Sequence, residues 1–144
     1  MPRGRASVRK GLGQARVARL ATIDGDTRPH LIPVCFVYVG RAFYTALDHK
    51  PKRVPPQRLA RVRNLLARPR VALLIDHYEE DWSRLWYVLI RGTARLVPQS
   101  SRPERTRVLR KLRDKYPQYT PRMLPDDALI IRIRPEHARS WSST

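Results

Sequence analysis

Cysteine is almost absent from this sequence, whose 144 residues contain only Cys35. A single thiol excludes an internal disulfide, and its place in the apolar run 31–39 indicates a small core side chain. That run of nine residues is the longest apolar stretch, and a membrane-spanning helix needs about twice as many. No apolar block follows the arginines of the N-terminus. We therefore expect a cytoplasmic protein with no targeting segment and no membrane partner.

The motifs of several enzyme classes are also missing. The sequence has no G-x-S-x-G elbow, no P-loop and no G-x-G-x-x-G. Cys35 has no adjacent base, and the four histidines lack the spacing of a catalytic triad. The carboxylates of residues 76–81 surround a single histidine, without the spacing of zinc or iron ligands. These absences argue against a hydrolase, a kinase, a Rossmann dehydrogenase and a metal site, and they leave no catalytic residue to name.

Acidic residues are scarce, with 12 Asp and Glu against 30 Lys and Arg, which gives a net charge of +18. Such a charge attracts nucleic acid, anionic lipid and phosphorylated small molecules alike, so it does not choose a ligand by itself. Coding bias toward arginine explains it equally well. RNA-binding sheets expose several aromatics on one basic face. Here the aromatics alternate with aliphatic residues on strands that look buried, which argues against a nucleic-acid partner.

The hydrophobic pattern predicts one domain over residues 1–144, mainly β with flanking helices. A short amphipathic helix is expected within 5–20, and whether the basic residues 1–10 are ordered stays open. Strands at 19–23, 29–40 and 42–48 are joined by short turns and predict an antiparallel meander. A helix over 58–67 would place Leu59, Val62, Leu65 and Leu66 on one stripe. The remaining predicted elements are strands at 70–76, 85–97 and 128–134, and a helix after Ser101 that starts with a capping box to Glu104 and buries Val108, Leu109 and Leu112.

Two basic or polar constellations could bind an anion. Lys50, Lys52 and Arg53 follow a strand and precede a helix, where turn amides and cationic side chains together make a phosphate cradle. A solvated basic loop is the competing interpretation. In the helix that follows, Arg63 and Asn64 are expected on a different face from Leu65 and Leu66. Asn64 is a poor helix former, which hints at a hydrogen-bonding role, although many such residues are simply exposed.

Two tryptophans lie in or just after the polar loop 77–83, and they could form the wall of a site for a planar ligand. Trp82 lies in the loop itself and Trp86 at the start of the next strand. Ordinary packing against neighbouring strands explains them as well, and both interpretations remain open.

Four segments in this order resemble the pyridoxamine 5'-phosphate oxidase-like superfamily of split β-barrels. They are residues 17–30, 43–45 with 50–53, 63–73 and 91–96, so the resemblance runs from about Ala15 to Val97. The Lys-Pro-Lys-Arg loop and the Arg-Asn-Leu helix are more similar to the branch that uses the deazaflavin F420. The chain departs from many FMN-binding relatives at 54–57, where the connection is longer, and this puts the roles of Arg53 and Arg58 in doubt.

The resemblance implies a split β-barrel homodimer with two cofactor sites at the subunit interface. The cofactor phosphate would contact Lys50, Lys52, Arg63 and Asn64, with Arg53 nearby. The ring would rest near Pro33, Val34 and Thr45, with Trp86 facing it across the interface.

The function implied is an F420-dependent oxidoreductase that transfers a hydride between the reduced cofactor and a small-molecule substrate. The arginine-rich surface would suit the polyglutamate tail of F420. Three alternatives remain: an FMN-dependent oxidase or reductase of the same fold, a haem- or tetrapyrrole-binding protein with His49 or His77 as axial ligand, and a nucleic-acid-binding module.

Overall fold

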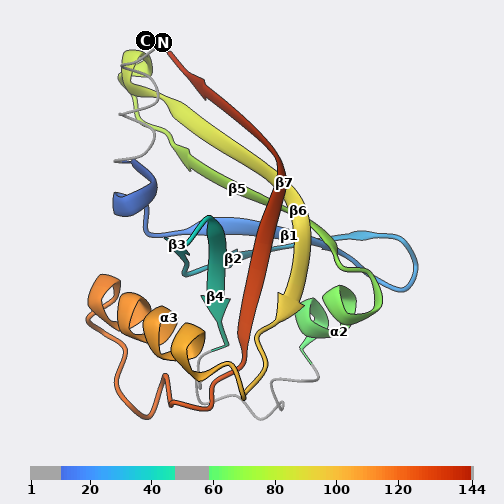
Figure 1. Ribbon diagram of the computed structural model, residues 1–144. Coiled ribbons are helices and arrows are strands. Elements are labelled where there is room, and N and C mark those ends of the chain that lie inside the picture. The colour runs from blue at the N-terminus through green and yellow to red at the C-terminus, as the bar shows by residue number, and fades with distance from the viewer. Residues whose placement is uncertain (1–10, 48–58, 144) are drawn as a thin grey trace.

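The computed structural model describes residues 11–47 and 59–143 (Figure 1). Residues 11–14 are helical and residues 15–17 are not, so the described part of the short helix expected within 5–20 ends at residue 14. The elements that follow are β1 (Ala18–Ile23), β2 (Pro29–Val34), β3 (Val37–Val39), β4 (Ala42–Ala46), α2 (Ala60–Ala67), β5 (Arg70–His77), the short 3-10 helix η2 (Trp82–Arg84), β6 (Trp86–Leu96), α3 (Arg102–Lys115) and β7 (Ile130–Ser142). The predicted mainly-β fold with flanking helices is confirmed.

The strands form one antiparallel sheet in the order β2-β1-β5-β6-β7-β4-β3. Although β2 and β3 are consecutive in the sequence, they lie at opposite edges of this order. The predicted single strand over 29–40 is therefore wrong, and so is the three-stranded meander. The backbone of Phe36 bonds to the side chains of Tyr116 and Lys115 instead of to a neighbouring strand. Because those side chains satisfy its peptide groups, the chain can leave the sheet at 35–36 and cross to the other half.

Two apolar cores hold this sheet together. The larger one lies inside the curved sheet and buries alternate residues of β1, β5 and β6, among them Leu20, Leu73 and Ile75. The smaller one lies between α3 and the strands β4 and β7, with Val108 and Leu112 fully buried. Every residue of β4 is buried because the two cores cover its opposite faces. No described helix is long and apolar enough to cross a membrane.

The last strand, β7, continues well beyond its predicted end at 134. A proline normally ends a strand, but here Pro135 lies at a bulge, where the register of β6 and β7 shifts between Arg91 and Gly92. The pairing resumes and runs to Ser142 opposite Trp86. Residues 75–77, 86–91 and 136–142 thus form a three-stranded extension, here called the wing, that rises away from α3 (Figure 1).

Gly92 allows β6 and β7 to approach closely at this bulge. A Cβ atom at position 92 would lie 2.1 Å from the carbonyl oxygen of Arg134. We expect Gly92→Ala to lower the free energy of unfolding by about 1 to 2 kcal/mol, since backbone must move to relieve the contact. Urea unfolding measures this change. Gly25→Ala is the control, because nothing lies within 4 Å of its new Cβ, and equal effects in the two variants would contradict the account.

Helix α2 turns a different face to the sheet than the sequence predicted. Val62, Asn64 and Leu65 are buried, whereas Leu66 is 62% exposed and Arg63 is exposed. Placing Leu66 on the buried stripe and grouping Asn64 with Arg63 are both wrong. The reason is a polar contact inside the core: the Asn64 Nδ2 donates to the Thr22 Oγ1 of β1 at 3.0 Å. This bond makes Asn64 compatible with burial.

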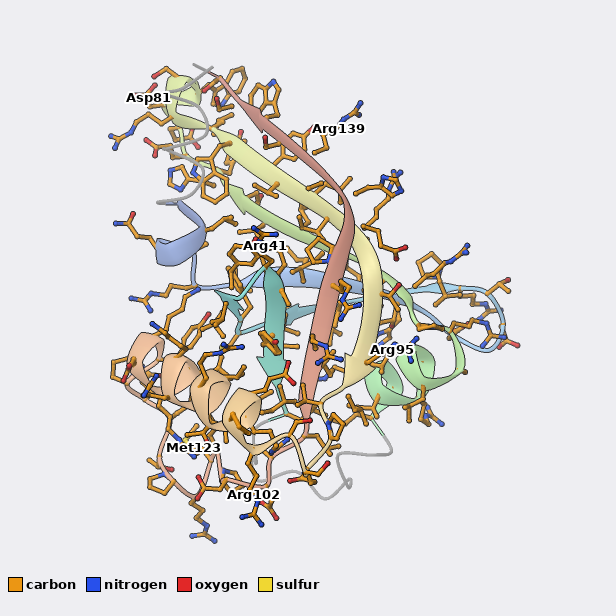
Figure 2. All side chains as sticks on the ribbon, in the orientation of Figure 1. Arg41, Asp81, Arg95, Arg102, Met123 and Arg139 are labelled. Carbon is orange, nitrogen blue, oxygen red and sulfur yellow. The ribbon has the colours of Figure 1, made fainter. Side chains whose placement is uncertain are left out.

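Helix α3 starts where predicted, after Ser101, and it buries Val108, Leu109 and Leu112 as predicted. The capping box does not form, because the Ser101 side chain makes no capping bond. The carboxylate of Glu104 instead accepts hydrogen bonds from the Tyr44 hydroxyl at 2.6 Å and from Arg132 at 2.9 Å. These bonds tie the first turn of α3 to β4 and β7, in a region crowded with side chains (Figure 2).

Candidate functional site

A pocket of about 220 Å³ lies at the split between the two halves of the sheet. Pro33 and Val34 at the end of β2 form one side of it, and Thr45 near the end of β4 forms another. These are the three residues that the resemblance placed near a cofactor ring. They belong to two separate hairpins at distant positions in the sheet, and the crossing at 35–36 brings them together.

Two arginines and a tyrosine also line this pocket, and none of the three was among the predicted site residues. Arg16 comes from the segment before β1, Arg61 from the first turn of α2 and Tyr119 from the loop after α3. Arg61 lies three positions before Asn64, which places both on one side of the helix. That spacing is the one signal that could have identified Arg61. The pocket thus combines an apolar wall with two guanidinium groups.

The residues that the resemblance assigned to the phosphate lie in different places relative to the pocket. Lys50, Lys52 and Arg53 lie outside the described residues, in the segment that follows the pocket residue Ala46. Arg63 is exposed on α2 and does not line the pocket. The side chain of Asn64 is 7% exposed and donates to Thr22. Within α2, the residue that lines the pocket is therefore Arg61.

The two tryptophans of the 77–86 region lie away from this pocket within one chain. Trp86 is half-buried, packs on Gly11 and stacks on His77 with ring centroids 6.4 Å apart. It lines a separate hollow of about 450 Å³ at the far end of the wing, beside η2. Trp82 is exposed, and its indole N–H donates to the Tyr78 hydroxyl. A contact between Trp86 and a ligand in the split pocket would need a second subunit.

The wall behind the pocket is fixed by Tyr116 at the end of α3. Its hydroxyl accepts from the Phe36 amide at 3.0 Å and lies 3.0 Å from the carbonyl oxygen of Arg16. Burial raises the pKa of Tyr116 to about 12, so the hydroxyl stays protonated at neutral pH and can donate to that carbonyl. The Arg16 guanidinium in turn donates to the backbone carbonyl of Lys115. These bonds hold Arg16 at the rim of the pocket.

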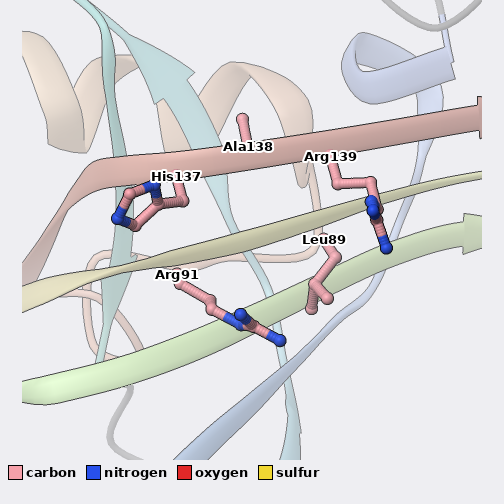
Figure 3. A pocket seen from close by; sticks show the side chains of 5 residues that line it. All are labelled: Leu89, Arg91, His137, Ala138 and Arg139. Carbon is pink, nitrogen blue, oxygen red and sulfur yellow. The ribbon is translucent and has the colours of Figure 1, made fainter.

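The outer face of β2, β1, β5, β6 and β7 is open, and it combines apolar with basic residues. Leu31 is 65% exposed, and Trp141 at the end of β7 is also exposed. Between them, Leu89, Arg91, His137, Ala138 and Arg139 line a shallow hollow of about 320 Å³ (Figure 3). Arg91 is paired with His137 across the strands, which brings like charges together when His137 is protonated. An apolar face of this kind is typical of a protein–protein contact.

No group of three or more His, Cys, Asp or Glu side chains in the described parts of the chain is placed to hold a metal ion. His77, one of the two histidines considered as a haem ligand, pairs with Glu79. His49, the other, lies outside the described residues.

Comparison with solved structures shows the fold. A conserved hypothetical protein of Mycobacterium tuberculosis is 22% identical, with a TM-score of 0.76, and the match covers 96% of this chain and 84% of that protein. A FAD-binding protein of Mesorhizobium loti is 21% identical over 92% of this chain and 89% of its own, with a TM-score of 0.68. A protein described as an F420 reductase is 22% identical over 90% and 94%, with a TM-score of 0.65. No curated protein matches the sequence significantly.

A family model settles the classification that these structures suggest. The model for pyridoxamine 5'-phosphate oxidase matches residues 5–142, nearly the whole chain. The seven-stranded antiparallel sheet with its flanking helices is the split β-barrel that the sequence resemblance implied. The chain therefore belongs to the pyridoxamine 5'-phosphate oxidase family.

Proposed function

We propose that the protein is an F420-dependent oxidoreductase that binds the deazaflavin at the split between β2 and β4. The observation that carries this proposal is the convergence of Pro33, Val34 and Thr45 on one pocket beside Arg16 and Arg61. The proposal is supported by two neighbours of the same fold, one described as an F420 reductase and the other as a FAD-binding protein. The alternative is FMN in the same pocket.

The chemistry of the pocket fits a planar, anionic group. Val17, Val34 and Ala46 give it apolar surface, and the two arginines supply positive charge. Its volume of about 220 Å³ is below the roughly 300 to 1,000 Å³ of ordinary ligand sites. The described residues of one chain thus make half of a site. We propose that a second copy, docked on the open outer face, and the segment with Lys50, Lys52 and Arg53 complete it.

Each part of the site has a distinct role in this proposal. The cofactor, when bound, supplies the hydride for a small-molecule substrate. Pro33, Val34 and Thr45 orient the ring and keep water from one of its faces. Arg16, Arg61 and the lysines of 50–52 hold the phosphate and attract the anionic tail. No side chain is assigned as a proton donor.

Titration of ligand-stripped protein with F420 and with FMN, followed by fluorescence, tests the cofactor assignment. We expect F420 to bind in the micromolar range or more tightly than that, FMN to bind more weakly, and both affinities to fall at higher salt. Tighter binding of FMN than of F420 would mean that FMN is the cofactor of this site. Binding of neither would contradict the oxidoreductase proposal.

Replacing Lys52 by alanine is expected to raise the dissociation constant for F420 at least about tenfold, or roughly 1.4 kcal/mol. The reason is the loss of a charge-assisted hydrogen bond to the phosphate, a bond worth about 1.5 to 3 kcal/mol. Isothermal titration calorimetry measures the change. Lys111→Ala, which removes the same charge from the exposed side of α3, should leave the affinity nearly unchanged. An unchanged affinity in Lys52→Ala would remove this residue from the site.

Leu31→Glu is expected to weaken the proposed homodimer at least about tenfold, because it places a charge within the proposed apolar contact. Analytical ultracentrifugation over a concentration series measures the dissociation constant. Leu66→Glu is a matched control, since Leu66 is as exposed as Leu31 but lies on α2. Docking on this face would be contradicted if the wild-type protein were monomeric at all concentrations. Equal dimer dissociation constants in the two variants would contradict it as well.

A further inference from the structure

A larger cavity lies on the inner side of the wing, and it shares Arg16 with the lining of the split pocket. This cleft of about 1110 Å³ runs between the wing, β3 and the C-terminal half of α3. Its wall includes the apolar residues Val37, Val39, Phe43, Val88 and Ile90, beside polar ones such as Gln14 and Ser140. A cavity of this size and composition is the usual form of a binding site for an organic molecule.

Positive charge gathers at the α3 end of the cleft. Lys111 and Lys115 on α3 and Arg16 before β1 line this end, together with one acidic residue, Asp114. Lys115 makes no ion pair with Asp114 or with any other carboxylate in residues 11–47 and 59–143. The cleft is thus apolar along its length and cationic at one end.

Lys115 is held in place by contacts that leave part of its ammonium group available. Its Nζ donates to the Phe36 carbonyl at 3.0 Å and lies 3.7 Å from the centre of the Phe36 ring. Both contacts come from the fixed crossing between β2 and β3. An ammonium has three donors, so the Phe36 carbonyl uses one of them. A half-buried cation with no carboxylate partner gains from an anion that replaces its lost hydration.

We propose that this cleft binds an amphipathic monoanion, whose carboxylate or sulfonate contacts Lys115 and whose apolar body lies against Val37, Val39 and Val88. The shape of the cleft supports this choice, since its charge lies at one end and its apolar surface runs away from that end. The inference does not rest on the cofactor proposal, because the cleft shares only Arg16 with the lining of the split pocket and binding here does not need a cofactor there.

The charge of Lys115 gives the site a pH signature. Burial, with a smaller effect from Arg16, lowers the pKa of Lys115 to about 8. Anion binding requires the protonated form, so affinity should be highest below pH 8 and fall as the pH rises above it. The other groups near Lys115 are Arg16, Cys35 and Tyr116, and Lys111 and Asp114 line the same cleft. Tyr116, with a pKa of about 12, stays neutral over this range.

The test uses 8-anilinonaphthalene-1-sulfonate as the probe, with the full-length, cofactor-free protein, and sodium decanoate as a competitor. We expect one probe per chain, displaced by decanoate, with binding that weakens progressively between pH 8 and 10. N-phenyl-1-naphthylamine, the same probe without its sulfonate, should bind at least about tenfold more weakly. Lys115→Met should weaken the sulfonate probe at least about tenfold at pH 7, and Arg110→Met, an equal charge change on the exposed side of α3, should not.

Lys115→Arg separates an anion contact from a purely structural role. Because arginine stays charged to pH 10, this variant should keep its affinity where the wild type loses it. The pH series is repeated with Cys35→Ala, so that the nearby thiol makes no contribution to it. No probe binding would mean that a second copy or residues 1–10 fill the cleft, and this would overturn the proposal. Equal affinity for the two probes, or no change in Lys115→Met, would overturn it as well.

Discussion

An Arg61→Glu variant is expected to bind F420 about 100-fold more weakly than the wild type, a change of about 2.7 kcal/mol. Arg61 lines the split pocket together with Arg16, Pro33 and Thr45. The substitution removes a charge-assisted contact worth about 1.5 to 3 kcal/mol and adds repulsion against an anionic cofactor. Calorimetric titration at two salt concentrations measures the effect. The loss should persist at high salt, since a contact inside a pocket is screened less than a surface charge.

Two other charge reversals on the helices make this prediction specific. Arg110→Glu changes the net charge equally on the exposed side of α3, and it should weaken binding only slightly and only at low salt. Arg63→Glu tests the residue that the family resemblance assigned to the phosphate. Arg63 lies on α2 but does not line the pocket of one chain. A large loss in Arg63→Glu with none in Arg61→Glu would contradict the placement of the site.

Glu104→Ala is expected to lower the free energy of unfolding by about 2 to 3 kcal/mol. Its carboxylate accepts hydrogen bonds from the Tyr44 hydroxyl and the Arg132 guanidinium. Removing it leaves the buried hydroxyl of β4 and the charge of β7 without their partner. The value lies below that of a fully buried pair because the side chains of Glu104 and Arg132 are 21% and 25% exposed. Asp114→Ala on the exposed side of the same helix is the control and should be nearly neutral.

The same carboxylate should make stability depend on pH in the acidic range. Burial alone would raise the pKa of Glu104, but the hydrogen bonds from Tyr44 and Arg132 lower it below the ordinary value of 4.5. A carboxyl whose pKa is lower in the folded state stabilises the fold above its unfolded pKa, and this contribution is lost as the pH falls through the folded value. The difference in the free energy of unfolding between wild type and Glu104→Ala should therefore be largest at neutral pH and decrease below about pH 4.5. A gap that does not change with pH would contradict the ionic role.

The elements that the sequence predicted correctly are those set by local pattern. The apolar runs within 70–76 and 85–97 predicted β5 and β6, and the periodicity after Ser101 predicted α3. The break between β2 and β3 was missed because nothing in the apolar run 31–39 marks it. It depends on Tyr116, which is 80 residues away from Phe36 in the sequence. The second half of β7 was missed because a proline such as Pro135 normally ends a strand. Here the bulge at Gly92 lets the pairing of β6 and β7 resume.

The candidate site was predictable in part, and for a similar reason. Pro33, Val34 and Thr45 came from the family resemblance, and the structure places them on one pocket. Arg16 and Tyr119 reach the same pocket from segments about 100 residues apart, so no local pattern could connect them. Asn64 is buried because its side chain donates a hydrogen bond to Thr22, which lies on another element.

Cys35 offers the most direct test of where the cofactor binds. It is the single cysteine of the chain and it lines the split pocket, so its alkylation by N-ethylmaleimide reports on access to that pocket. The rate, followed by mass spectrometry, is compared with and without a saturating concentration of whichever cofactor the titration selects. The account predicts that the bound cofactor slows alkylation at least about tenfold, with equal rates after unfolding in urea. An unchanged rate under conditions where the cofactor is bound would place it elsewhere and contradict the central claim.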